Sequence, residues 1–476
     1  MSLELCYLPA TELLKKFRSK ELSPLDVLDA QLARAEQTEP EVNCLSFKYF
    51  DQARDQAKKA EQAYAKGSAR PLEGITITIK DEPMLEGYPT QNGSLLREGY
   101  VASYSDPICE RVMSAGAIMH ARSTTPEFSV HYCTWNYVTG VTRNPWNTDI
   151  SVGGSSGGSG AALASGVTTL ATGSDIGGSI RVPAAFNGVY GFKPPFGRVP
   201  ELPPFSSERY AASGPLGRTL QDVTLLQQII SGPHEDDLYC LPAYELPSEH
   251  GSVKGMKIAL CMDLGFYNVA QDVQDAIRQA VDVLRDQGAE VAEVKLNWDR
   301  ERTFATISNH LAYEFGSVLR AEIEASGIDH DKLTPYVKYF ALRDDPPTAT
   351  DELEANLYSG EMLAELNRAV FANGFDALLC PTLATSDVAA DYDPFSGDEV
   401  KIDGRAVDHW FDPVMTIAFN ILGRFPVMNV PVGLSSIKVP IGMQIIGPKM
   451  EDRVPFAIAN AYQSGSQWLF DAPPMA

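Results

Sequence analysis

Residues 153–191 read GGSSGGSGAALASGVTTLATGSDIGGSIRVPAAFNGVYG, and this stretch decides the fold that we expect. Its order is a glycine-serine loop, an alanine-rich helix over 159–164, a short strand over 168–171 and a second glycine-serine turn. Low-complexity sequence is usually repetitive, whereas this stretch contains no repeat. Glycine, serine and alanine at this density therefore indicate that backbones pack closely around it.

The segments before this stretch predict helices followed by a strand. Residues 10–66 carry apolar side chains at helical spacing, and Ser23 is placed as an N-cap before Pro24 at the first helical position. Residues 74–80, GITITIK, alternate strictly and predict a strand that ends at a lysine. We expect a helix over 107–115 and a short strand over 117–120 to follow.

Beyond residue 220 the chain returns to alternation of strands and helices. Strands are predicted at 257–261 and 291–294, with a helix between them whose apolar face is formed by residues 273–284. Residues 300–372 are predicted to be mostly helical, and later strands are predicted at 377–380 and 443–446.

We therefore predict an α/β fold in one domain, 1–476, in which helices cover a mixed twisted sheet. Within it we distinguish an N-terminal helical segment (1–66), a core (67–230) and a C-terminal α/β portion (231–476).

The composition is that of a soluble globular protein. Hydrophobic residues make up 44% and charged residues 21% of 476 residues, and the net charge of −23 disfavours nucleic acid and anionic lipid as partners. Seven cysteines lie singly without a CxxC pair, so neither a disulfide framework nor a zinc site is expected. Because we find no signal peptide and no apolar run of ~18 residues, we expect a cytoplasmic protein without a membrane partner.

Two short motifs match other chemistry but lack its context. Residues 153–157 fit the GxSxG nucleophile elbow, which would make Ser155 the nucleophile of an α/β-hydrolase. An elbow follows a buried strand, whereas residues 144–149 are polar and turn-like. Ser435 and Lys438 fit SxxK but lie in a turn rather than at a helix start. A glycine-rich loop that leads into a helix can also bind an anion, so phosphate or nucleotide binding stays an alternative.

Three segments together indicate nucleophilic chemistry. A serine hydroxyl is a weak nucleophile unless a base takes its proton, and Lys80 can be that base when it is neutral. A strand that carries Lys80 into the interior favours the neutral form, because burial disfavours an ammonium ion and lowers its pKa. Ser155 and Ser179 supply hydroxyls from the two glycine-serine loops. Backbone N–H groups beside the second serine are expected to face a developing oxyanion, namely those of Ile176, Gly177, Gly178 and Ser179.

With these residues in place, the sequence resembles the amidase signature family over nearly its whole length. The motifs that carry the resemblance are GITITIKD (74–81), TRNPW (142–146), GGSSGGSGAALASG (153–166), TLATGSDIGGSIRVPAAFNGVYGFKPPFGRVP (169–200), SGPLGRTLQDVTLL (213–226), CPT (380–382) and PIGMQIIGP (440–448). The resemblance implies an α/β amidase fold and hydrolysis of C–N bonds other than peptide bonds.

The resemblance also implies a role for each matched residue. Ser179 attacks the carbonyl carbon and forms an acyl-enzyme, Ser155 relays the proton from a non-proline cis peptide, and Lys80 is the base. Water then hydrolyses the ester, and neither a metal nor an organic cofactor is implied. Supporting roles around the lysine and the nucleophile are implied for Ser156, Ser159, Asp175 and Arg181.

The substrate is less closely defined by the resemblance. Six side chains lie near segments that line substrate pockets in the family, although core packing explains them equally well: Phe128, Cys133, Trp135, Tyr210, His409 and Trp410. Thr76, Val152 and the extra residue in 420–426 depart from the usual pattern, so substrate preference cannot be transferred from well-known members. Aromatic residues make up 9% of the chain, which favours a small amide-like substrate with an aryl or hydrophobic acyl group, such as a carboxamide, anilide, acylhydrazide or carbamate.

Two functional classes follow from the resemblance. The first is a hydrolase of small-molecule amides, and a homodimer is suggested on the same ground. The second is the glutaminase (A) subunit of a transfer-RNA-dependent amidotransferase, which uses the same three residues and passes ammonia to a partner. That subunit typically carries glutamine where this chain has Val182, so we favour the hydrolase.

Overall fold

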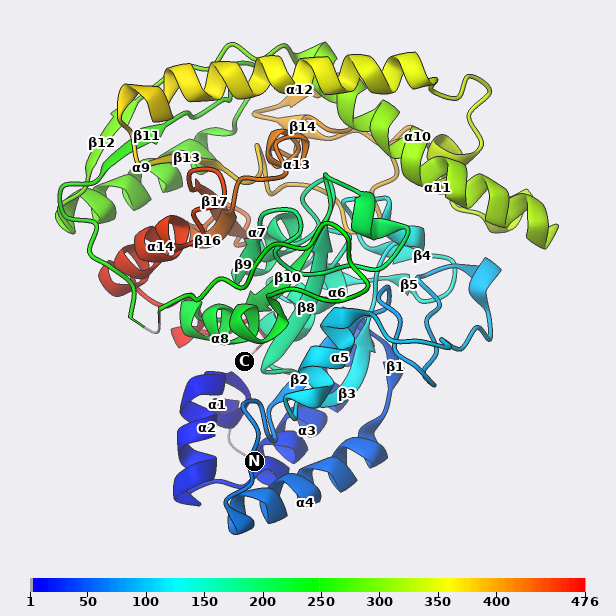
Figure 1. The fold of residues 1–476 in the computed structure, drawn as a ribbon, viewed down its shortest axis with the longest axis vertical. Coiled ribbons are helices and arrows are strands. Elements are labelled where there is room, and N and C mark those ends of the chain that lie inside the picture. Colours follow the sequence, from blue (N-terminus) through cyan, green and yellow to red (C-terminus); the bar gives the residue numbers. More distant parts are fainter. Residues whose placement is uncertain (1–2, 248, 476) are drawn as a thin grey trace.

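The backbone is organised around an eleven-stranded mixed sheet (Figure 1). The computed structural model describes residues 3–247 and 249–475. Parallel pairing occurs at β2–β3, β2–β8, β11–β12 and β11–β13, and the other pairs are antiparallel. In spatial order the strands are β1 (Leu45–Lys48), β3 (Ile118–Ser123), β2 (Thr76–Lys80), β8 (Leu170–Asp175), β10 (Ala212–Gly217), β9 (Tyr190–Lys193), β16 (Val427–Leu434), β17 (Pro440–Ile446), β13 (Ala377–Pro381), β11 (Lys257–Leu260) and β12 (Glu290–Glu293).

Helices cover both faces of this sheet, as the sequence predicted. At the N-terminal end lie α1 (Leu3–Tyr7), α2 (Ala10–Ser19), α3 (Pro24–Val42) and α4 (Phe50–Lys66), and in the middle α5 (Pro107–Ser114), α6 (Gly157–Ala164), α7 (Arg181–Asn187) and α8 (Leu220–Ile230). The C-terminal half adds α9 (Gln271–Asp286), α10 (Arg300–Ser326), α11 (Pro335–Ala341), α12 (Ala349–Ala369), α13 (Ala418–Ile421) and α14 (Arg453–Gly465). Figure 1 shows α10, α11 and α12 at the end of the molecule opposite α1–α4.

Short elements complete the described chain. Three small ladders pair β4 (Trp135–Asn136) with β5 (Gly140–Val141), β6 (Arg143–Asn144) with β7 (Asn147–Ser151), and β14 (Lys401–Ile402) with β15 (Arg405–Ala406). The 3₁₀ turns are η1 (Leu95–Arg97), η2 (Glu127–Ser129), η3 (Phe205–Ser207), η4 (His330–Lys332), η5 (Phe371–Asn373) and η6 (Leu469–Asp471). Among the helices described, none combines the length and apolar character needed to cross a membrane.

Most of the predicted elements are confirmed, with small shifts at their ends. Ser23 caps α3 through a capping box with Asp26, and Pro24 is the first helical residue. The prediction that 10–66 contains only helices is wrong at β1, a strand that lies between α3 and α4. Four residues of sequence carry little strand signal of their own, and β1 forms because its backbone pairs with β3.

The strand β2 shows why the alternating sequence is buried throughout. Ile77 and Ile79 point into an apolar cluster with side chains of α2, α5 and α8. Thr76 points the other way and donates a hydrogen bond to Gln31 at 2.6 Å. All five residues of β2 are buried because helices cover both of its faces, and the alternation separates apolar packing from internal hydrogen bonding.

Three chain segments meet at one end of the central strands of the sheet. The strands β2 and β8 run parallel, so the residues that end them lie side by side. Two hydrogen bonds show that the start of α6 runs antiparallel to β8. The Ser156 hydroxyl donates to the carbonyl of Ser174, and the Ser159 hydroxyl, one turn later, donates to the carbonyl of Thr172. The start of α6 therefore lies beside the ends of β2 and β8.

Candidate active site

Lys80 ends β2 inside the protein, with three polar partners around its amino group. Its Nζ donates to the Oγ of Ser155 at 2.7 Å and to the Oγ of Ser174 at 2.8 Å, and it forms an ion pair with Glu82. Only 1% of the Lys80 side chain is exposed. Burial lowers the pKa of Lys80 below its usual value, although the Glu82 carboxylate opposes this effect. A lysine in this position can exchange a proton with Ser155.

Ser155 lies immediately before α6, in the first glycine-serine loop. The Gly154–Ser155 peptide bond is cis. The glycines that open α6 allow the helix to pack against neighbouring backbone, since a Cβ at Gly158 would lie 2.4 Å from the backbone nitrogen of Thr124. The close packing predicted from the composition of this stretch is confirmed, and it carries Ser155 to Lys80.

Ser179 follows β8 in the second glycine-serine loop. The Asp175 carboxylate accepts the backbone N–H groups of Ile180 and Arg181 at 3.2 and 3.3 Å and so holds the turn that presents Ser179. The carbonyl of Ser179 accepts the N–H of Ser156 at 3.2 Å, which ties the two loops together. Ser179 lines the same cavity as Lys80 and Ser155, although no hydrogen bond joins the Ser155 and Ser179 hydroxyls in this structure.

Arg181 and Asp175 form a buried ion pair behind this turn. Arg181 donates to Asp175 at 2.8 and 2.9 Å, and it also bonds with Asn420 and Gln444 at 2.6 Å each. Burial alone would raise the pKa of Asp175, but the Arg181 charge and hydrogen bonds from Arg181 and Asn420 bring it below its usual value. The pair thus links the second glycine-serine loop to the C-terminal half of the chain. Ser156 and Ser159 support the same region through carbonyls of β8 and do not contact Lys80.

The backbone after Asp175 leaves a row of N–H groups unused. In the described residues, none of the four N–H groups of 176–179 donates to a protein acceptor. Gly178 has a φ of +128°, and a Cβ there would lie 2.1 Å from the Oγ1 of Thr416. Thr416 in turn donates to the carbonyl of Gly177 at 2.6 Å. Unused donors held in this way can stabilise an oxyanion.

Gly178→Ala is expected to lower kcat by about 10²- to 10³-fold, as for loss of an oxyanion donor. The added methyl group would displace either Thr416 or the loop. Gly433→Ala is the matched control, because Gly433 has a similar φ of +136°, does not line the cavity, and a Cβ there meets no atom within 4 Å. Steady-state kinetics of both variants check the prediction, and equal losses in the two would contradict it.

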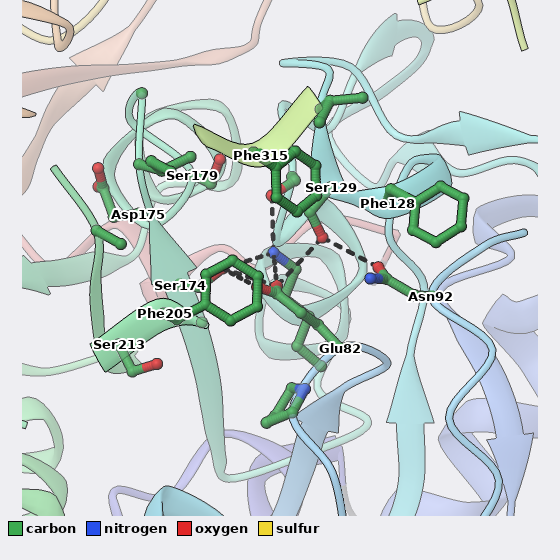
Figure 2. A pocket seen from close by; sticks show the side chains of 18 of the residues that line it. Glu82, Asn92, Phe128, Ser129, Ser174, Asp175, Ser179, Phe205, Ser213 and Phe315 are labelled. Atoms are coloured by element: carbon green, nitrogen blue, oxygen red, sulfur yellow. Dashed lines mark hydrogen bonds and ion pairs between the residues drawn. The ribbon is translucent and has the colours of Figure 1, made fainter. Parts of the chain in front are cut away.

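A cavity of about 360 Å³ opens in front of these residues. Its wall includes Lys80, Ser155 and Ser179, together with a set of aromatic side chains. Phe205 and Phe315 are labelled in Figure 2 among the residues that line the cavity. The aromatic side chains of the wall are Phe128, Phe205, Phe315, Phe340, Trp410 and Phe411, with Tyr100, Tyr104 and Tyr132.

Of the six side chains suggested as pocket residues, the structure places Phe128 and Trp410 in this wall. The other four pack elsewhere. Cys133 is fully buried, and the Trp135 indole donates to the carbonyl of Tyr392 at 3.0 Å. Tyr210 packs on His310, and His409 stacks on Phe304. These four were suggested by their position along the chain, and their side chains point into neighbouring packing instead.

Several residues of the site were missed by the sequence analysis. Glu82 lies only two residues beyond Lys80, and Ser174 lies inside the matched GSD motif, so the sequence held a signal for both. Thr416, Asn420 and Gln444 lie more than 230 residues from the turn that they support. No local pattern could have connected them to it.

Comparison with known proteins agrees with this geometry. The family model described as Amidase matches residues 26–454. The chain belongs to the amidase signature family. Its members hydrolyse C–N bonds of amides, and this amidase has the α/β fold of the family.

Individual amidase relatives match along most of their length. The A subunit of a glutamyl-tRNA(Gln) amidotransferase from Roseiflexus sp. (strain RS-1) is 31% identical over 492 residues, covering 96% of each chain. A solved structure of a bacterial aryl acylamidase has a TM-score of 0.90 and 28% identity, with 99% of each chain covered. The structure of 6-aminohexanoate cyclic dimer hydrolase has a TM-score of 0.84 and 25% identity, again with 99% of each chain covered.

Proposed function

We propose that this amidase is a stand-alone hydrolase that cleaves small amide-like compounds through an acyl-enzyme on Ser179. The observation that carries the proposal is the 2.7 Å hydrogen bond between Lys80 and Ser155, in a cavity that also contains the Ser179 hydroxyl. Together these groups supply a nucleophile, a relay and a base. The unused N–H groups of 176–179 lie beside the nucleophile.

The reaction begins when Ser179 Oγ attacks the carbonyl carbon of the substrate. Its proton passes to Ser155, and the proton of Ser155 passes to the lone pair of neutral Lys80. The N–H groups of 176–179 stabilise the oxyanion. As the C–N bond breaks, the proton returns from Lys80 through Ser155 to the leaving nitrogen. Water then attacks the ester by the same route, which releases the acid and restores Ser179.

The cavity wall supports an aryl or hydrophobic acyl group. Phe128, Phe315 and Phe340 contribute apolar surface to the cavity that the serines also line, and Trp410 stacks on Phe411 at 3.8 Å between ring centroids. Burial of such a group against aromatic rings is favourable because it removes apolar surface from water. A small polar acyl group would leave the rings exposed to water. The substrate leaving group can be ammonia, an aniline, a hydrazine or the amine of a carbamate.

A second candidate is the glutaminase subunit of a tRNA-dependent amidotransferase. It is favoured by the names of relatives at 28–31% identity along nearly the whole chain. Glutamine carries an α-carboxylate, which needs a cation. Of the two cations among the described cavity residues, Lys80 is paired with Glu82 and Arg97 with Glu322, so neither is free to bind it. We therefore propose the hydrolase, acting without a partner chain or nucleic acid. Self-association as a homodimer and a cytoplasmic location stay predictions.

The test measures amine or ammonia release from aryl amides, anilides, acylhydrazides, carbamates, short aliphatic amides and glutamine, without ATP or partner proteins. We expect turnover of an aryl or hydrophobic substrate, with kcat/KM above that for acetamide. Glutamine as the sole substrate would establish the second candidate. A preference for short aliphatic amides would contradict the proposed acyl group.

A further inference from the structure

Glu82 is a second ionisable group at the base, and the reaction described above does not use it. Its carboxylate accepts from the Ser174 hydroxyl at 2.7 and 3.0 Å and from the Ser129 hydroxyl at 3.1 Å, in addition to its ion pair with Lys80. Ser129 also contacts Asn92 at 3.2 Å. Figure 2 shows the side chains of Ser174, Ser129 and Asn92 around Glu82. The carboxylate is therefore held from several sides, and 18% of its side chain is exposed, toward the cavity that it lines.

The partners of Lys80 match the needs of an amine that gains and loses a proton. An ammonium group has three N–H donors, and three acceptors surround Nζ: the hydroxyls of Ser155 and Ser174 and the carboxylate of Glu82. A neutral amine has two N–H donors and one lone pair. If the two donors stay on Ser174 and Glu82, the lone pair points at Ser155, which is the direction that proton transfer requires.

The other charged groups near this pair already have partners or lie farther off. Asp175 on β8 is paired with Arg181, and Arg122 on β3 is paired with Asp81. Arg97, from η1, is paired with Glu322 of α10. Asp106, before α5, and Glu201, in the loop before η3, line the same cavity without a hydrogen bond or ion pair to Lys80, and burial raises the pKa of Asp106 to about 6 and that of Glu201 to about 8. Among described residues, Glu82 is the carboxylate in direct contact with the Lys80 amino group.

We propose that Glu82 is a positioning residue, which aims the Lys80 lone pair at Ser155 and stabilises the ammonium formed when the proton arrives. This inference rests on the proposed function. The carboxylate makes Lys80 a stronger base and keeps the amino group in one orientation through both proton transfers. It also means that the enzyme reaches full activity only at higher pH than it would with a neutral side chain at position 82.

The experiment compares Glu82→Gln with wild type through the pH dependence of kcat/KM. Loss of the charge is expected to move the midpoint of the acid limb down by about 1–3 pH units, as for removal of a neighbouring opposite charge. The kcat on the alkaline plateau should fall, since the lysine becomes a weaker base. Glu322→Gln is the matched control, because it removes a carboxylate from the same cavity wall without touching Lys80. Its acid limb should stay at the wild-type midpoint.

An unmoved midpoint in Glu82→Gln, or a change confined to KM, would overturn the proposal. An equal shift of the midpoint in Glu322→Gln would also overturn the proposal, because it would show that any carboxylate in the cavity wall has this electrostatic effect. A second readout does not need turnover: NMR titration of ¹³Cε-labelled lysines, with Lys80→Met assigning the Lys80 signal. The Lys80 midpoint should fall in Glu82→Gln, and an unchanged midpoint would refute the contact. If wild type hydrolyses no substrate, the proposed function fails, whereas this titration still decides the role of Glu82.

Discussion

Ser179→Ala is expected to reduce kcat for the best amide substrate by roughly 10⁴- to 10⁶-fold, because the acyl-enzyme can no longer form. The structure supports a specific loss of chemistry rather than of folding. Ser179 is held through its backbone carbonyl and the turn at Asp175, and neither involves the hydroxyl. Amine release under single-turnover conditions, together with thermal unfolding of both proteins, measures the two effects separately.

Ser213→Ala is the matched control for this variant. Ser213 on β10 is a further serine in the cavity wall (Figure 2), and the hydrogen bonds of the Lys80 amino group go to Ser155 and Ser174 instead. Its loss should change kcat by less than about 10-fold, as for a group outside the proton relay. Mass spectrometry should detect an acyl adduct in wild type at steady state and none in Ser179→Ala. Residual turnover in Ser179→Ala within tenfold of wild type would show that another residue is the nucleophile.

Lys80→Met is expected to lower kcat/KM by about 10²- to 10⁴-fold, because the general base is lost. In wild type the base must be neutral, so kcat/KM should rise with pH as Lys80 loses its proton. Since burial lowers the pKa of Lys80 from its usual value of 10.5, the midpoint of this rise should lie below pH 10.5. A pH profile of kcat/KM measures both the fall and the midpoint.

Lys193→Met separates this effect from the removal of any buried lysine. Lys193 on β9 is fully buried, its amino group donates to the carbonyl of Pro194 at 3.3 Å, and burial lowers its pKa to about 7. It does not line the cavity. The acid limb should therefore survive in Lys193→Met and disappear in Lys80→Met. Loss of the acid limb in Lys193→Met would show that the limb reports the titration of Lys193 and would contradict its assignment to Lys80.

Much of the fold followed from periodicity, and the exceptions share a cause. The strand-helix-strand unit of β11, α9 and β12 was predicted because its apolar residues repeat at regular spacing over a long segment. By contrast, β10 reads ASGPLG and carries no strand pattern. It forms because β8 and β9 offer backbone partners on both sides. Pairing of this kind depends on segments that come together only in the folded chain.

The cavity wall also combines residues that the sequence suggested with residues that only the packing of distant helices brings in. Phe128 was suggested from its neighbourhood in the sequence, whereas Phe315 and Phe340 come from α10 and α11, well over a hundred residues downstream. Four suggested residues pack outside the wall. A side chain's distance along the chain from a motif does not determine its direction, because packing of the surrounding helices sets it.

The sequence by itself identified the groups that we propose to react: a lysine that ends an alternating strand, two serines among glycines, and a run of small residues that would let the backbone approach a substrate. These are local properties, encoded by residue type and spacing. Only the tertiary structure decided that Glu82 and Ser174 share the lysine with Ser155. It also decided that aromatic side chains from distant segments line the same cavity as the serines, because contacts between such segments form only when the chain packs.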